Sequence, residues 1–122
     1  MPNTSPLAAI LKQCCETYSL DTCLVSADDG LLLAMAGEPL EDDLSSYIPK
    51  WLVHGEKISE HSGLGSMACG FIVPKNKSGI IAVQKIKQTE QHHIFIAVKM
   101  KRIPPNLINT LDKIAAQVNQ II

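Results

Sequence analysis

The stretch DTCLVSADDGLLLAMA constrains the fold of this chain more strongly than any other part of the sequence. Two apolar runs flank Asp28, Asp29 and Gly30, and an Asp-Gly pair between two such runs is a strong local signal for a β-hairpin. We therefore predict strands over residues 22–26 and 31–36, connected by a turn at these three residues.

Three other segments carry apolar residues at helical spacing. The first begins near residues 4–5, with Pro6 at the favoured first helical position, and leads into the hairpin. The second covers residues 40 to about 60, and the third begins at residues 104–105. Pro49 lies inside the second segment, so this helix either bends there or begins anew with Pro49 in its first turn.

Three further strands are expected over residues 67–73, 80–87 and 92–101. In the last of these, apolar residues occupy both faces, which is typical of a central strand that is covered on both sides. One face carries Ile94, Ile96, Val98 and Met100, and the other carries Phe95 and Ala97. The element order predicts a single α+β domain over residues 1–122, with a mainly antiparallel five-stranded sheet and helices on both faces.

Composition narrows the class of protein. Hydrophobic residues make up 46% of the 122 residues, which excludes a disordered chain. Eleven basic and 12 acidic residues give a net charge of −1, so no strong field attracts nucleic acid or an anionic membrane. We find no apolar run of the ~18 residues that a membrane helix needs, and no signal-peptide pattern. The four cysteines, Cys14, Cys15, Cys23 and Cys69, form no C-x-x-C pair and fit reduced thiols of a cytoplasmic protein.

No motif indicates catalysis, a metal or a cofactor, and we predict none of these. His92 and His93 are adjacent in an expected strand and would point to opposite faces, while His54 and His61 are two helical turns apart. The glycines of residues 63–65 precede a strand rather than a helix, so they do not form a phosphate-binding loop.

The acidic residues have structural explanations. Asp28 and Asp29 are interpreted as turn residues rather than as a catalytic carboxylate pair. Glu41, Asp42 and Asp43 fall in the first turn of the second helix, where negative charge suits the helix dipole.

The basic residues are predicted to gather in one cluster on neighbouring strands and a turn. Its members are Lys75, Lys77, Lys85, Lys87, Lys99, Lys101 and Arg102. This cluster is either the solvated margin of the sheet or a docking patch for an acidic partner surface.

The order of elements resembles the Roadblock family, which includes dynein light chains and bacterial partners of small GTPases. The resemblance covers nearly the whole chain and is carried by ETYSLDTCLVSADDGLLLAMAG, GSMACGFIVPK, GIIAVQKIKQ and HHIFIAVKMK. It implies a homodimer or a heterodimer with a paralogous subunit, without catalytic residues, in which the second helices pack together and the following strands pair across a two-fold axis. It also implies binding to a Ras-like small GTPase or scaffolding of a larger assembly.

On this sequence the resemblance places the dimer elements at residues 44–58 and 67–73. Trp51, the single tryptophan, either packs on the sheet or anchors a partner, and the helical period does not decide between the two. The expected dimer or partner contacts are Leu44, Tyr47, Ile48, Trp51, Leu52, Met67, Cys69 and Phe71.

Two other functional classes have related folds. A profilin-like small-molecule sensor would need a pocket between sheet and helix with convergent polar groups. A secretion chaperone would be more acidic and would place a third strand before the middle helix. An enzyme is the class that the sequence favours least.

Overall fold

Helices and strands follow one another in the order predicted from the sequence. The computed structural model describes residues 5–40, 44–87 and 93–121. In these ranges the elements are α1 (Pro6–Tyr18), β1 (Thr22–Ala27), β2 (Leu32–Gly37), α2 (Leu44–His61), β3 (Gly70–Ile72), β4 (Ile80–Lys87), β5 (His93–Met100) and α3 (Leu107–Asn119). The acidic residues 41–43, expected at a helix start, and His92, expected in a strand, lie outside the described residues.

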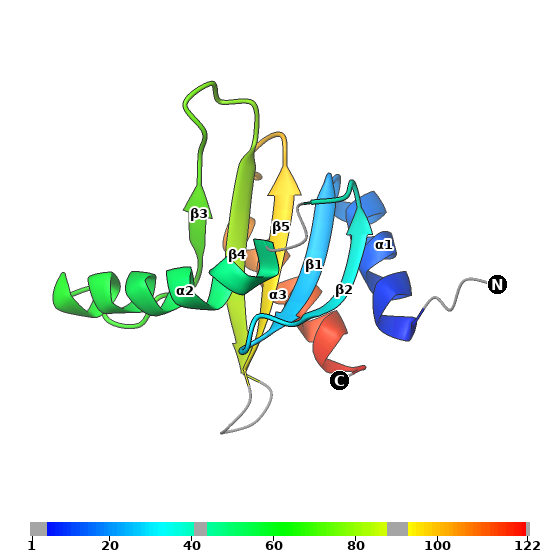
Figure 1. The fold of residues 1–122 in the computed structure, drawn as a ribbon. Helices are drawn as coiled ribbons and strands as arrows, with labels where there is room; N and C mark the ends of the chain where they lie inside the picture. The colour runs from blue at the N-terminus through cyan, green and yellow to red at the C-terminus, as the bar shows by residue number, and fades with distance from the viewer. Residues whose placement is uncertain (1–4, 41–43, 88–92, 122) are drawn as a thin grey trace.

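The described strands form one antiparallel sheet in the order β2-β1-β5-β4-β3 (Figure 1). The hairpin β1–β2 therefore forms one side of the sheet, and the three later strands form the rest. The predicted α+β fold is confirmed, and β5 lies at the centre of the sheet as its two apolar faces indicated.

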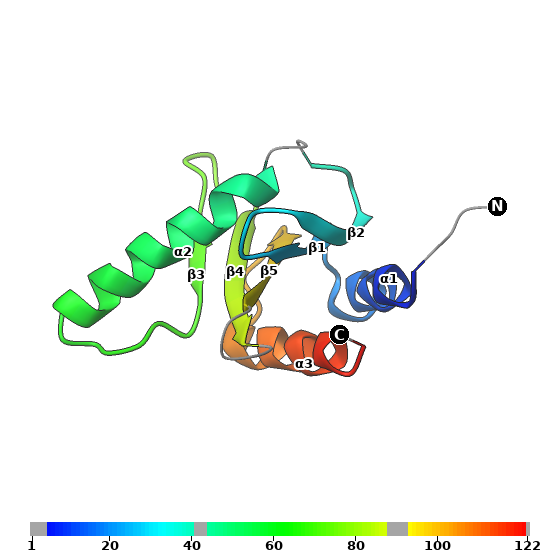
Figure 2. The same ribbon diagram turned by 60° about the horizontal axis from the view of Figure 1, so that its bottom comes forward.

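Helices cover both faces of this sheet. Figure 2 shows α1 and α3 on one face and α2 on the other. Each face has its own hydrophobic core. The core under α1 and α3 includes Ile94, Ile96, Val98 and Met100, and the core under α2 includes Phe95 and Ala97. The predicted division of the two faces of β5 is confirmed.

A tight turn joins β1 to β2. The Gly30 N–H donates to the Ala27 carbonyl (3.0 Å), and the Leu31 N–H donates to the Asp29 carboxylate (3.0 Å). Gly30 has a φ of 89°, a backbone conformation that disfavours any side chain. A Cβ there would also lie 2.9 Å from Ser46 Cα, because the turn packs against the beginning of α2.

The pairing of β2 with β1 contains one irregularity. Val25 pairs with Ala34 whereas Ser26 pairs with Leu32, so Leu33 is an extra residue on the outer strand. Three leucines at this edge are 40% to 61% exposed, namely Leu31, Leu32 and Leu33.

The predicted extent of β3 is wrong. The strand covers Gly70–Ile72 rather than residues 67–73 because the residues before it pack on α2. The Met67 N–H donates to Glu56 Oε1 (3.1 Å), and a Cβ at Gly55 would lie 2.9 Å from the Met67 sulfur.

The predicted start of the last helix is also wrong. α3 begins at Leu107 rather than at residues 104–105, and its first turn closes with the Thr110 N–H donating to the Asn106 carbonyl (3.0 Å). A residue that precedes proline avoids the helical conformation, so the Pro104-Pro105 pair delays the helix.

Pro49 lies inside α2, which continues across it and does not begin anew there. Proline has no N–H, so the carbonyl four residues earlier, that of Ser45, receives no helical hydrogen bond. The buried Ser26 hydroxyl lies 3.4 Å from that carbonyl and offers it a donor. The Ser45 hydroxyl in turn donates to the Gly30 carbonyl at 2.8 Å. The residue that breaks the helical pattern is therefore accommodated by contacts with the hairpin.

Candidate partner interface

The first half of α2 is fixed to the sheet. Ile48 and Leu52 are only 3% and 4% exposed, and they pack in one cluster with Leu24, Val83 and Phe95. Of the predicted partner contacts, these two are therefore packed in the core of this chain. The reason is geometric, because these two positions, four residues apart, share the helix face that meets the sheet.

The second half of α2 leaves the sheet. Its buried residues are Ser45, Ile48 and Leu52, and none of the described positions after Leu52 is buried. Figures 1 and 2 show this part of the helix extending past β3, beyond the sheet edge. We call residues 53–64 the overhang. It exposes three large apolar side chains, Val53 (54% exposed), Ile58 (71%) and Leu64 (80%).

Hydrogen bonds hold the end of the overhang in place. The Leu64 N–H donates to the Ser59 carbonyl (3.0 Å), and the Ser59 hydroxyl donates to the Gly65 carbonyl (2.6 Å). Together with the bond from Met67 to Glu56, they connect the loop after α2 to the helix it leaves. The overhang is therefore an ordered surface rather than a frayed helix end.

Strand β3 forms the sheet edge next to the overhang. It pairs with β4 on one side, and no strand in the described ranges pairs with its other side. Phe71, Ile72 and Val73 are 46% to 51% exposed. An unpaired edge with apolar side chains is a site where another strand can add.

The alternation of side chains separates the residues of β3 between two faces. A Cβ at Gly70 would lie 3.0 Å from Trp51 Cη2, so Gly70 faces α2. Phe71 and Cys69 instead line a groove with Ile103 on the face that carries α3. Trp51 is half-buried and packs on the core under α2, which agrees with the first of its two interpretations.

The eight predicted contacts are thus not brought together on one surface. Leu44, Trp51 and Met67 pack around the core under α2, and Tyr47 on the same helix is 59% exposed. Val53 and Leu64 of the overhang are not among the contacts predicted from the sequence. Their only signal is that they are apolar outside the stripe that packs on the sheet.

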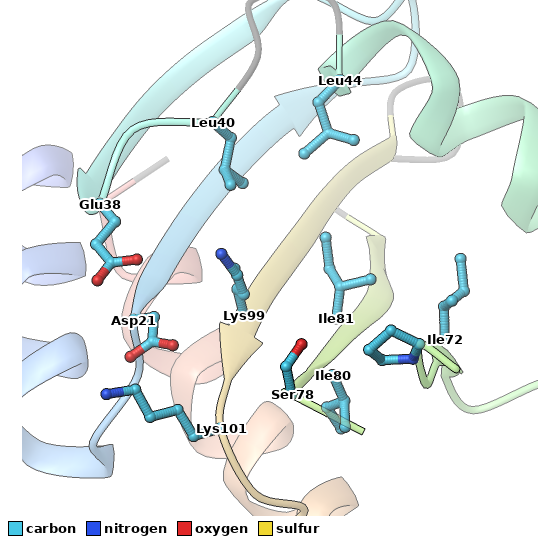
Figure 3. A pocket seen from close by; sticks show the side chains of 12 residues that line it. Asp21, Glu38, Leu40, Leu44, Ile72, Ser78, Ile80, Ile81, Lys99 and Lys101 are labelled. Atoms are coloured by element: carbon cyan, nitrogen blue, oxygen red, sulfur yellow. The ribbon is translucent and has the colours of Figure 1, made fainter. Parts of the chain in front are cut away.

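A groove opens beside the beginning of α2, at one end of the sheet (Figure 3). Its volume is about 600 Å³, within the range of small-molecule sites. We call it the end groove. It is lined by Asp21, Glu38, Leu40, Leu44, Ile72, Pro74, Ser78, Gly79, Ile80, Ile81, Lys99 and Lys101.

Comparison with solved structures decides the fold family. Over 98% of its length the chain superposes on 97% of Myxococcus xanthus MglB, with a TM-score of 0.77 and 12% identity. A structure described as MglB with a tetrameric arrangement matches 94% of this chain and 86% of its own, with a TM-score of 0.73 and 13% identity. A Roadblock/LC7 domain from Streptomyces avermitilis matches 95% of this chain and 97% of its own, with a TM-score of 0.69 and 10% identity.

The chain has a Roadblock-like fold. No protein-family model and no curated protein matches the sequence. At 10% to 13% identity, the likeness of this Roadblock-like fold to its neighbours concerns the path of the backbone and not their side chains.

The register of β4 and β5 separates the lysines of the predicted basic cluster into two groups. In the antiparallel pair β4–β5, Lys85 lies opposite Phe95 and Lys87 opposite His93, whereas Lys99 lies opposite Ile81. The end of one strand thus meets the beginning of the next, so Lys85 and Lys87 are at the opposite end of the sheet from Lys99. The prediction of one continuous basic patch is wrong for this reason.

The aspartates of the hairpin turn interact with the backbone. Asp29 accepts the bond from Leu31, and an Asp28 carboxylate oxygen lies 3.5 Å from the His93 N–H.

The thiols of Cys14 and Cys23 are buried, and those of Cys15 and Cys69 are half-buried. Burial raises the pKa of the Cys23 thiol far above its ordinary value, and it also raises the pKa of Cys14, Cys15 and Cys69. All four are therefore poor nucleophiles near neutral pH. Within the described part of the chain, no helix is long and apolar enough to cross a lipid bilayer.

Proposed function

We propose that this chain is a dimeric, non-enzymatic interaction module that binds a Ras-like small GTPase or scaffolds a larger assembly. The observation that carries the proposal is the overhang, a helical segment with exposed Val53 and Ile58 that extends past β3, beyond the sheet edge. Ile58 is 71% exposed on an ordered helix beside an open strand edge, and an exposed large apolar side chain in that setting supports an interaction surface.

A second copy of the chain meets the requirements of both the overhang and the open edge. A two-fold axis beside β3 would pair that strand with its symmetry mate and extend the sheet from one copy into the other. The same axis would place each overhang above the partner's sheet. The exposed side chains of Ile58 and Ile72 would then lose contact with water in one assembly.

The GTPase part of the proposal is supported by the family resemblance of the hairpin and of the strands that follow α2. The likeness to MglB structures, one of them described as tetrameric, supports oligomer formation by this backbone. The absence of a phosphate-binding loop in the sequence agrees with a regulator that does not itself hydrolyse nucleotide.

Two measurements test the proposal. Light scattering over a range of concentrations should give twice the 13.3 kDa chain mass. Purified Ras-like GTPases encoded in the same genome, loaded with GDP or with a non-hydrolysable GTP analogue, should then bind the dimer in one nucleotide state only. A monomer at all concentrations contradicts the dimer, and a dimer that binds no GTPase in either state leaves the scaffold as the remaining role.

A further inference from the structure

The end groove has preformed walls. The Thr22 hydroxyl donates to the Glu38 carbonyl (2.7 Å), and the Glu38 N–H donates to the Asp21 carbonyl (2.8 Å). These two bonds attach the connection that carries Glu38 and Leu40 to the beginning of β1. The Asp21 N–H donates to the Lys99 carbonyl (2.7 Å), which fixes the opposite wall to the same strand end.

Charged and apolar side chains line different parts of this groove. Figure 3 shows Asp21, Glu38 and Lys101 together on one side and Leu44 and Ile81 on the other. The apolar part would shield a hydrocarbon group of a ligand from water.

Lys99 lies between these two parts (Figure 3). Its side chain is half-buried, and within the described residues its ammonium has no hydrogen-bond or ion-pair partner. A half-buried ammonium without a partner is stabilised by any anion that enters the groove. Among the described residues of the lining, two carboxylates accompany the two lysines, so the groove also offers acceptors for a cation.

We propose that the end groove binds a small zwitterion with an apolar body, the chemical class of the apolar α-amino acids. The ligand carboxylate interacts with Lys99, and its ammonium interacts with Asp21 on the charged side. Its hydrocarbon group contacts Leu40, Leu44 and Ile81. The inference goes beyond the proposed dimer and does not depend on it, because every contact comes from one chain.

Three probes with the same hydrocarbon chain separate the contributions of the two charges. Norleucine carries both groups, hexanoate lacks the ammonium, and pentylamine lacks the carboxylate. Each is titrated into the ¹⁵N-labelled chain, and the amide shifts report both the dissociation constant and the location of binding. We expect norleucine to bind most tightly, with the largest shifts at Ile72, Ile81 and Lys99.

Matched variants test which side chain binds which charge. Lys99→Gln should weaken norleucine and hexanoate by about tenfold or more and leave pentylamine unchanged. Asp21→Asn should weaken norleucine and pentylamine and leave hexanoate unchanged. Lys12→Gln on α1, on the other face of the sheet, is the control and should change none of the three.

Three results would overturn the inference. Equal affinities for the three probes would show that the charges of the groove do not select a ligand. Saturable shifts confined to another part of the chain would show that the site lies elsewhere. A change in solution mass caused by Lys99→Gln, without any effect on the probes, would show that a second copy of the chain occupies the groove.

Discussion

Replacing Ile58 by serine provides a strong test of the overhang as a dimer surface. The side chain is 71% exposed, and full burial of an isoleucine contributes about 2 kcal/mol. Covering that exposed fraction in a dimer therefore contributes about 1.5 kcal/mol for each copy. A two-fold axis uses the residue twice, so Ile58→Ser should weaken the dimer by about 3 kcal/mol, or about 100-fold in its dissociation constant.

Sedimentation equilibrium at several concentrations measures this constant for the parent chain and the variant. Leu31→Ser is the matched control, since Leu31 is 61% exposed and lies at the β2 edge of the sheet, opposite to β3. It should leave the dissociation constant unchanged. Both variants should unfold at the urea concentration of the parent when all are studied as monomers, because exposed positions contribute little to the fold. An unchanged dimer constant for Ile58→Ser would refute the reasoning.

Three further outcomes follow from the packing of the single chain. Leu52→Ala should lower the free energy of unfolding by about 2–5 kcal/mol in urea titrations, since it leaves a cavity under α2, and a loss below about 1 kcal/mol would contradict the burial of this side chain. Gly37→Ala should lower the melting temperature more than Gly63→Ala, because a Cβ at Gly37 would overlap the Asp21 carbonyl whereas one at Gly63 meets open space. Both glycines have positive φ, so equal decreases in melting temperature would show that only the backbone angle matters. Folding raises the pKa of the Cys23 thiol, so the contribution of the protonated thiol to the free energy of unfolding is complete below its ordinary pKa of 9.0 and is lost as the pH rises above that value. In urea titrations between pH 8 and 10.5, the free energy of unfolding should therefore fall less for Cys23→Ala than for the parent chain.

The order of the elements could be predicted because their periods are clear in the sequence. The two apolar faces of β5 predicted its central place, since a strand with one wet face would not carry Phe95 and Ile96 in succession. The hairpin followed from its Asp-Gly turn. In each case the signal lies within one element and depends on local geometry.

The candidate interface could not be predicted to the same degree, because it depends on where elements end relative to one another. Ile48 and Ile58 both lie on the apolar stripe of one helix, yet only the first is buried against the sheet of its own chain. No period within α2 reveals where the sheet beneath it stops. Likewise, Lys85 and Lys99 carry the same charge on adjacent strands, and only the register places them at opposite ends.

The two edges of the sheet differ, and this difference limits growth of an assembly. The β2 edge carries an extra residue, Leu33, which interrupts the regular spacing that an added strand would need. β3 pairs with β4 without such an irregularity. Addition of a further copy is therefore favoured at the β3 edge only. In a dimer that pairs β3 with the β3 of its symmetry mate, both chains use this edge. The proposed dimer, formed in this way, would be closed at two chains and would leave no regular strand edge from which a fibre could extend.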